Sequence, residues 1–330
     1  MAKPREDWAY TAPARPATPG RAARPAQAFV FMEEAVLALN IAMATRRPLL
    51  ISGEPGGGKT SLALFAALAL GRKFYRQTVT SRTQVTDLLS SFDAVGRLGD
   101  AQRQVEKSTQ SYLSPGALWW ALSPTTAAQR GREPKADATP LADPSDAGSP
   151  PGAVLLLDEI DKADPDVPND LLEVLDERQF TIPETRDEIV RQEGRDLLIM
   201  LTTNDERELP AAFLRRCVTL ELPEPPGEGW LVDIAKRRYP DAPAKAGAKA
   251  VRPRDAHAWD ALYFAVATEL IHRRKLAGTT RRRKPSIAEF LDAIAACREL
   301  APNGAQSTPV ELRALLDSVL VKDRVRSPAG

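Results

Sequence analysis

One short segment constrains the fold of this chain more than any other: Gly53 to Thr60, which reads GEPGGGKT. An apolar run from Pro48 to Ser52 precedes it and is typical of a buried parallel strand. An Ala- and Leu-rich segment from Ser61 to Leu70 follows and suits a buried helix. The turn between them fits the pattern GxxxxGK[ST], whose backbone N–H groups wrap phosphate oxygens. The sequence therefore predicts an α/β core with a phosphate site at this turn.

The residue types of this loop match what a nucleotide phosphate requires. Glycine permits the tight turns and keeps side chains out of the way. Lys59 would supply a point charge to the β- and γ-phosphates, the Thr60 hydroxyl would ligate Mg²⁺, and the following helix would direct its N-terminus at the phosphates. The predicted nucleotide-binding residues of the loop are Gly53, Glu54, Pro55, Gly56, Gly57, Gly58, Lys59, Thr60 and Ser61.

A second motif supplies acids. The apolar run Ala153 to Leu157, which predicts a central strand, ends in Asp158 and Glu159. At a strand end beside the loop, Asp158 would hold Mg²⁺, usually through water, and Glu159 would polarise the water that attacks the γ-phosphate. The alternative is an acidic N-cap of the next helix. Asp161 and Lys162, which follow, fit either a solvated turn or a supporting role.

Strand and helix patterns alternate through the first two thirds of the chain. Strands are predicted at 48–52, 74–80, 153–157, 197–203 and 218–222, and helices at 29–44, 61–70 and 164–178. Alternation of this kind implies a parallel sheet covered by helices on both faces. The pattern predicts a three-layer αβα nucleotide-binding core over residues 28–222.

The remaining segments differ in composition. Residues 1–27 are rich in Pro, Ala and Arg and predict a flexible tail. Residues 123–152 lack periodicity and predict a mobile loop inserted into the core. Residues 223–330 predict a small all-α domain and a C-terminal extension. Its amphipathic helices are marked by Trp259, Leu262, Tyr263, Val266 and Leu270, by Ile287, Phe290, Leu291 and Ile294, and by Leu312, Leu315, Leu316 and Val319.

Composition argues against several classes of protein. The net charge of +1 gives no overall field toward nucleic acid or an anionic membrane. Cys217 and Cys297 have no metal-site spacing and predict buried thiols. No apolar run approaches the ~20 residues that span a bilayer, and no signal-peptide core is present. A cytoplasmic protein without membrane insertion is therefore expected.

Two further features favour ordinary structural roles. Trp119 and Trp120 could bind a partner, although packing beneath the inserted loop is the preferred interpretation. The basic runs Arg273–Lys275 and Arg281–Lys284 predict a solvated face, because no aromatic residues alternate with them as in a nucleic-acid site.

The nucleotide motifs resemble those of the AAA+ superfamily, and within it the MoxR-type branch. The resemblance rests on residues 48–60, 154–178 and 197–223, together with segments 86–102 and 114–122, which resemble an insertion before the second acidic strand. It covers roughly residues 28–300. It implies a sheet of strand order 5-1-4-3-2, a helical lid over ATP and Mg²⁺, and a homo-oligomeric, hexameric ring.

The resemblance also implies roles for single residues. Asn204 corresponds to the sensor that holds the attacking water. Arg216, or alternatively Arg215, corresponds to an arginine finger that reaches the nucleotide of the neighbouring subunit, although Cys217 stands where Phe is common. The lid sensor departs from the family pattern, because Ser286 occupies the usual arginine position. Lys284 or Arg283 could replace that arginine.

Three functions remain open from the sequence. The first is ATP-driven remodelling or assembly of a protein client, together with a von Willebrand A domain protein on a separate chain. The second is an ATPase switch subunit of a multicomponent signalling or anti-phage defence system, with slow turnover. The third is a motor stimulated by nucleic acid. ATP is expected over GTP because the guanine-reading NKxD motif is absent.

Overall fold

The computed structural model describes residues 32–130, 152–239, 258–280, 283–300 and 316. The predicted tail at 1–27 and most of the loop predicted at 123–152 lie outside these residues. So does the helix predicted around 312–319, apart from Leu316, which is buried against the other lid helices.

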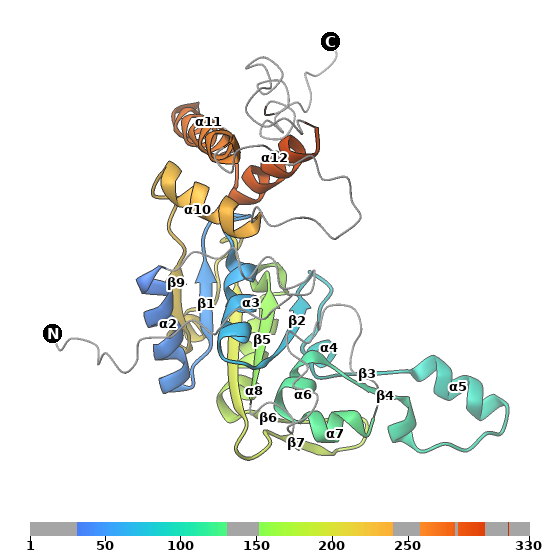
Figure 1. The fold of residues 1–330 in the computed structure, drawn as a ribbon. Coiled ribbons are helices and arrows are strands. Elements are labelled where there is room, and N and C mark those ends of the chain that lie inside the picture. The colour runs from blue at the N-terminus through green and yellow to red at the C-terminus, as the bar shows by residue number, and fades with distance from the viewer. Residues whose placement is uncertain (1–31, 131–151, 240–257, 281–282, 301–315, 317–330) are drawn as a thin grey trace, which may run out of the picture.

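A five-stranded parallel sheet forms the centre of the core (Figure 1). Its strands, in spatial order, are β2 (Lys73–Thr78), β5 (Gly152–Asp158), β8 (Asp196–Thr202), β1 (Leu49–Ser52) and β9 (Val218–Glu221). Numbered along the chain among themselves and read from β9, these strands have the order 5-1-4-3-2. The predicted strand order is therefore confirmed, and each predicted strand lies within two residues of its observed bounds.

Helices cover both faces of the sheet. The helices that pack on the sheet or beside it are α2 (Glu33–Thr45), α3 (Lys59–Ala69), α4 (Val85–Leu89), α6 (Ala117–Leu122), α8 (Asp166–Glu177) and α9 (Ala211–Arg216). Successive residues of β5 point to opposite faces. Val154 and Leu156 pack with α2 and α3, whereas Leu155 and Leu157 pack with α6 and α8. This alternation explains why β5 is apolar from Ala153 to Leu157, and it confirms the three-layer core.

Two short hairpins were not predicted. One pairs β3 (Ser90–Phe92) with β4 (Leu113–Pro115), and α5 (Ala94–Gln102) lies at the end of the arm that this hairpin begins (Figure 1). The other pairs β6 (Gln179–Thr181) with β7 (Glu188–Val190). Strands of three residues contain too few alternating positions to give a periodic signal.

The loop predicted at 123–152 needs a correction at its start. Helix α7 (Pro124–Ala128) occupies this part, with Pro124 at its first position and Ala127 fully buried. The Trp119 indole donates a hydrogen bond to Thr126 Oγ1 at 2.9 Å and meets the Phe180 ring edge-on. Both tryptophans of the Trp119–Trp120 pair are buried, and Trp119 packs against α7 and the second hairpin.

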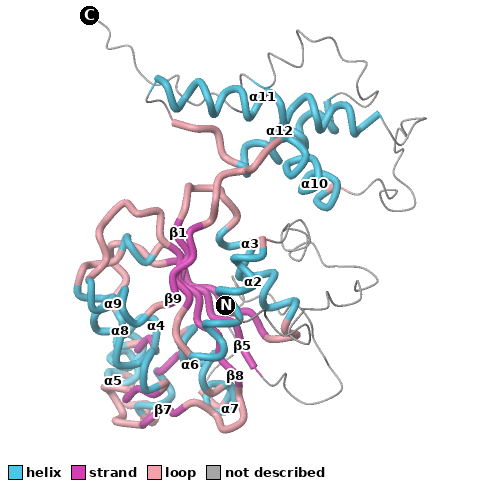
Figure 2. Tube along the Cα trace, turned by 90° about the vertical axis from the view of Figure 1, so that its left-hand side faces the viewer, coloured by secondary structure: helices cyan, strands magenta, loops and turns pink. Residues whose placement is uncertain are grey.

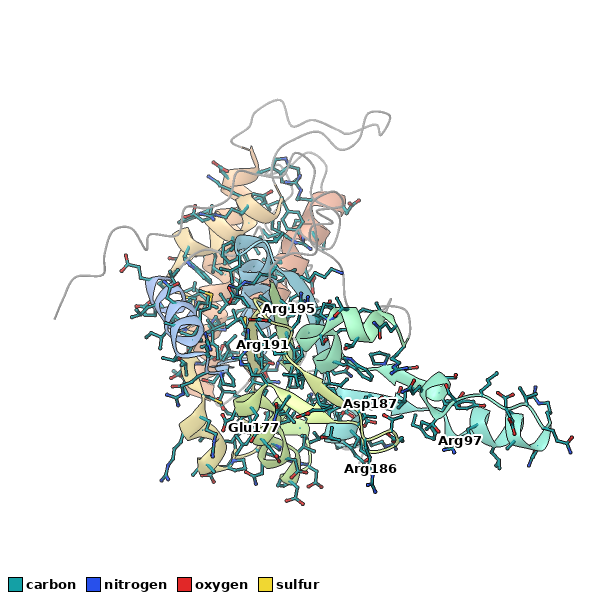
Figure 3. The ribbon with its side chains drawn as sticks, turned by 90° about the horizontal axis from the view of Figure 1, so that it is seen from below. Arg97, Glu177, Arg186, Asp187, Arg191 and Arg195 are labelled. Atoms are coloured by element: carbon teal, nitrogen blue, oxygen red, sulfur yellow. The ribbon has the colours of Figure 1, made fainter. Side chains whose placement is uncertain are left out.

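The end of the sheet away from the glycine loop is rich in arginine. A cavity of about 380 Å³ opens there, and Figure 3 shows Arg191 and Arg195 near the middle of this end. The buried Arg178 donates to the carbonyls of Leu197 and Arg46 at 2.8 and 2.6 Å. Burial, and then the neighbouring Arg191 and Arg46, lower the pKa of Arg178 to about 10. Arg178 thus has a structural role, because it donates hydrogen bonds to one carbonyl just after a helix and to another near the start of a strand.

A separate helical lid lies beyond the carboxyl ends of the strands (Figure 2). It consists of α10 (Glu228–Arg238), α11 (Ala258–Thr280) and α12 (Ile287–Leu300). These helices share their own apolar core, in which Tyr263, Val266 and Phe290 are fully buried. The predicted all-α domain is therefore confirmed over the described residues. None of the described helices combines the length and the apolar character needed to cross a membrane.

Candidate functional site

The loop from Gly53 to Thr60 connects β1 to α3 at the carboxyl edge of the sheet. Gly58 precedes the first residue of α3 with φ of 100°, and Gly56 has φ of 74°. Both values lie in the left-handed region that favours glycine. A Cβ atom on Gly56 would also lie 2.8 Å from the Ser286 side chain of the lid. The backbone path and the close approach of the lid therefore require glycine at these positions.

Lys59 lies at the centre of the site. Its Nζ donates to Gly53 O at 2.5 Å, to Glu54 O at 3.3 Å and to Asn204 Oδ1 at 2.7 Å. Burial lowers the pKa of Lys59, and nearby acids, with Asp161 first, partly oppose this shift. The ammonium group is thus held among oxygen atoms that an incoming phosphate can replace.

Asp158 ends β5 and faces the first turn of α3. Its Oδ2 accepts a hydrogen bond from Thr60 Oγ1 at 3.2 Å and forms an ion pair with Arg76 at 2.6 Å. Its Oδ1 accepts from Thr202 Oγ1 at 2.5 Å. Arg76 and Thr202 were not predicted. Their strands β2 and β8 flank β5, and Arg76 lies opposite Leu156, two residues before Asp158, from where its long side chain reaches the carboxylate.

The donor set beside Thr60 fits Mg²⁺. Among the described residues, no group of three or more His, Cys, Asp or Glu could hold a metal by itself. Mg²⁺ prefers few protein ligands and completes its shell with water and phosphate oxygens. The Thr60 hydroxyl and the Asp158 carboxylate lie 3.2 Å apart, which suits two oxygens around one small cation. Thr60 and Asp158 would therefore hold the ion, and the ion would neutralise phosphate charge when bound.

Glu159 follows Asp158 in a left-handed conformation, with φ of 63° and ψ of 50°. Its backbone N–H donates to Thr202 Oγ1 at 2.9 Å, which helps to hold this uncommon geometry. Its carboxylate accepts from Lys162 Nζ at 2.9 Å and from Asn204 Nδ2 at 3.4 Å. Glu159 occupies the N-cap position of the short helix Ile160–Lys162 that follows, but its side chain makes no cap bond to that helix.

Asp161 links the acid strand to the loop that carries Asn204. It is 2% exposed, and its Oδ2 accepts from the backbone N–H groups of Asn204 at 3.2 Å and Glu206 at 3.0 Å. Of the two interpretations of Asp161, these contacts favour the supporting role over the solvated turn. The structure thus brings together Lys59, Thr60, Asp158, Glu159 and Asn204 from three segments of the chain.

The two candidate arginines lie elsewhere. Arg215 and Arg216 end α9, and both are exposed. Arg216 pairs with Asp176 at 2.7 Å and donates to Ala212 O at 3.3 Å. Neither arginine contacts Lys59, Asp158 or Glu159 of its own chain. Within one subunit, the structure does not bring Arg215 or Arg216 to the site.

The lid meets the loop through a cluster of charges. Lys284 contacts Glu224 and also lies 3.5 Å from Glu54, whereas Arg283 pairs with Glu289 within the lid. Arg274, which was not predicted, donates to Glu54 at 2.6 Å, to Glu224 at 3.2 Å and to the Pro285 carbonyl at 2.7 Å. The solvated face predicted for the basic run Arg273–Lys275 is therefore wrong at Arg274, which is buried, and nothing in the sequence of the run marks which residue is buried.

Replacement of Arg274 by Ala should loosen the lid. The Arg274 side chain is 5% exposed, and its removal leaves the two acids with Lys284 as their cation. Because those acids are about half exposed, solvent screening limits the expected loss of unfolding free energy to about 1–2 kcal/mol. Faster hydrogen exchange in α11 and α12 would report the effect. Lys275→Ala, at an exposed position of the same run, should leave exchange unchanged, and equal exchange in both variants would contradict the assignment.

The comparison that bears on this geometry is a match to a family model. The family model described as AAA domain (dynein-related subfamily) matches residues 48–217, just over half of the chain. A candidate ATPase of Cytophaga hutchinsonii is similar in structure, with 14% identity, coverage of 90% of this chain and 83% of that chain, and a TM-score of 0.41. NtrX of Brucella abortus has 13% identity, coverage of 93% and 57%, and a TM-score of 0.47. No curated protein matches the sequence.

Proposed function

The chain belongs to the dynein-related subfamily of AAA domains, and from this premise we propose that it hydrolyses ATP with Mg²⁺ as a ring of identical subunits that acts on a protein client. One observation carries the proposal. Lys59, Thr60, Asp158, Glu159 and Asn204 converge on one locus at the carboxyl edge of the sheet, where α/β proteins bind nucleotides.

The residues of the site would have different roles in phosphate binding and in hydrolysis. The loop N–H groups and Lys59 would bind the β- and γ-phosphates, and Lys59 would exchange its bond to Asn204 for one to phosphate. Asn204 can then hold a water with its amide, which both donates and accepts. Glu159 would orient that water and accept its proton.

The exposed arginines suggest how subunits cooperate. Arg216 and Arg215 lie outside the site of their own chain, so we assign them to the nucleotide of a neighbour, where a cation stabilises the charge of the transition state. Such an arrangement makes each site incomplete until the ring forms. A hexamer of the MoxR type, with a von Willebrand A domain protein as partner, is the assembly that the sequence resemblance favours.

The lid offers a route from nucleotide to client. Arg274 and Lys284 bind Glu54 of the glycine loop, so a change in the loop on phosphate binding or release would be transmitted to α11 and α12. Movement of the lid against the core would then remodel or assemble the client. This mechanism needs no membrane insertion and no nucleic acid.

A switch subunit with slow turnover is the second candidate, and one contact favours it. Lys162 holds the Glu159 carboxylate at 2.9 Å, and this contact raises the pKa of Lys162. A carboxylate that is bound to Lys162 is not free to orient the attacking water, so release of this pair by a partner would switch hydrolysis on.

Purified protein should form a larger assembly with ATP and Mg²⁺ than without nucleotide, as measured by native mass spectrometry. Phosphate release should be measured in parallel with protein partners and with DNA. Stimulation by a protein partner supports remodelling, and strong stimulation from near-zero turnover supports the switch. Stimulation by DNA alone would contradict both and favour the motor. Monomers that hydrolyse ATP at full rate would contradict the ring.

A further inference from the structure

Arg47 connects the start of β1 to the end of the helix that carries the two exposed arginines. We propose that Arg47 is a positioning residue that fixes Arg215 and Arg216 for the site of the neighbouring subunit. This inference rests on the proposed function, and in particular on a nucleotide site that is shared between two subunits.

Three hydrogen bonds carry the proposal. Arg47 Nε donates to Arg216 O at 2.9 Å, and Nη2 donates to Cys217 O at 3.1 Å and to Arg215 O. These are the last two residues of α9 and the residue after it. The last carbonyls of a helix have no partner within the helix, and a planar guanidinium can bind several of them at once. Arg47 thus fixes the backbone from which both arginine side chains project.

The sheet explains why Arg47 reaches this place. Strand β9 begins one residue after Cys217 and pairs with β1, with Leu49 opposite Val218. Val218 N donates to Pro48 O at 2.8 Å, so the segments before the two strands run side by side. A residue just before β1 is therefore adjacent to the end of α9, although about 170 positions separate them.

Charge favours the same arrangement. The C-terminal end of a helix carries a partial negative charge, which a cation stabilises. The thiol of Cys217 at this junction is buried, and burial raises its pKa to about 12, so it stays neutral. Asp176 of α8 meets this junction from the other side and binds the Arg216 side chain at 2.7 Å. Arg47 therefore fixes the backbone. Asp176 holds the Arg216 side chain in an ion pair, and an approaching phosphate can replace Asp176 in that pair.

This role predicts an asymmetric defect. Arg47→Ala should weaken hydrolysis in the adjacent subunit and leave the nucleotide site of its own chain intact, because Arg47 has no contact with Lys59, Asp158 or Glu159. Turnover of the pure variant should fall at least tenfold, since a 1 Å misplacement of a reacting group can cost about 100-fold. The affinity for ATP and the melting temperature should stay close to those of the parent protein.

Mixed assemblies test this asymmetry. Glu159→Gln subunits have correctly placed arginines and an inactive nucleotide site. Arg47→Ala subunits have misplaced arginines and an intact nucleotide site. An equimolar mixture should hydrolyse ATP faster than the sum of the two separate preparations. A mixture of Arg47→Ala with Arg216→Ala should not, because both lack a functional arginine. Arg47→Lys, which cannot bind three carbonyls in one plane, should lie between the parent and Arg47→Ala.

Two controls make the outcomes distinct. Arg46→Ala, an exposed neighbour in the same turn, should leave turnover unchanged. The mixture of Arg216→Ala with Glu159→Gln tests the shared site itself, and failure of this pair would overturn the proposed ring together with the role of Arg47. Recovery in that pair without recovery in the Arg47→Ala mixture would overturn the inference alone. So would parental turnover in pure Arg47→Ala.

Discussion

Glu159→Gln should lower the rate of ATP hydrolysis at least 100-fold while ATP binding persists, because a general base contributes roughly 10²–10⁴-fold. The amide keeps the size of the side chain and its hydrogen bond to Asn204 but cannot accept a proton. Loss of one negative charge near Lys59 should not weaken phosphate binding. Phosphate release under saturating ATP measures the first effect, and titration with a fluorescent ATP analogue measures the second.

A matched control separates chemistry from a general charge effect. Glu208→Gln removes an exposed carboxylate from the loop after Asn204 and should leave turnover unchanged. Turnover of Glu159→Gln within threefold of the parent would remove Glu159 from the proposed mechanism. Loss of ATP binding in this variant would show instead that Glu159 maintains the structure of the site.

Lys59→Met should reduce the affinity for ATP at least 100-fold, which corresponds to about 2.7 kcal/mol. Methionine has a similar length but supplies neither the charge nor the three hydrogen bonds of Lys59. Burial lowers the pKa of Lys59, so the charge itself costs folding energy, and its removal should not reduce the melting temperature. Calorimetric titration of the variant with ATP and Mg²⁺ measures the affinity.

The prediction for Lys59 separates binding from folding. Lys275→Met, at an exposed position of α11, is the matched control and should bind ATP like the parent. Equal affinities in the two variants would exclude a phosphate contact at Lys59. A fall in melting temperature of Lys59→Met would indicate that the bonds to Gly53 and Glu54 outweigh the burial of charge.

The sequence predicted the core because its signals are local and strong. The apolar run at β5 lies between two helical layers, so every position of it must be apolar, and the glycine loop has backbone angles that few other residues adopt. The strand order came from the family resemblance, because alternating strands and helices alone do not fix it. The lid followed from the spacing of Trp259 and the apolar residues after it.

What the sequence did not predict depends on contacts between distant segments. Arg76 reaches Asp158 only because β2 lies beside β5, and Arg274 reaches Glu54 only because the lid lies over the loop. The sequence around Arg76 and Arg274 shows no pattern that would distinguish them from solvent-exposed arginines. The lid candidate Lys284 does lie at the loop, whereas Arg283 binds within the lid, and this difference arises from packing alone.

The central claim is that the glycine loop and the acid pair share one nucleotide–magnesium complex. Calorimetric titration of the Glu159→Gln protein with ATP, with Mg²⁺ and again with a chelator, tests it most directly. The proposed site predicts tight binding with Mg²⁺ that weakens markedly when the chelator removes the ion. Absence of binding in both titrations, or equal affinity with and without Mg²⁺, would contradict it.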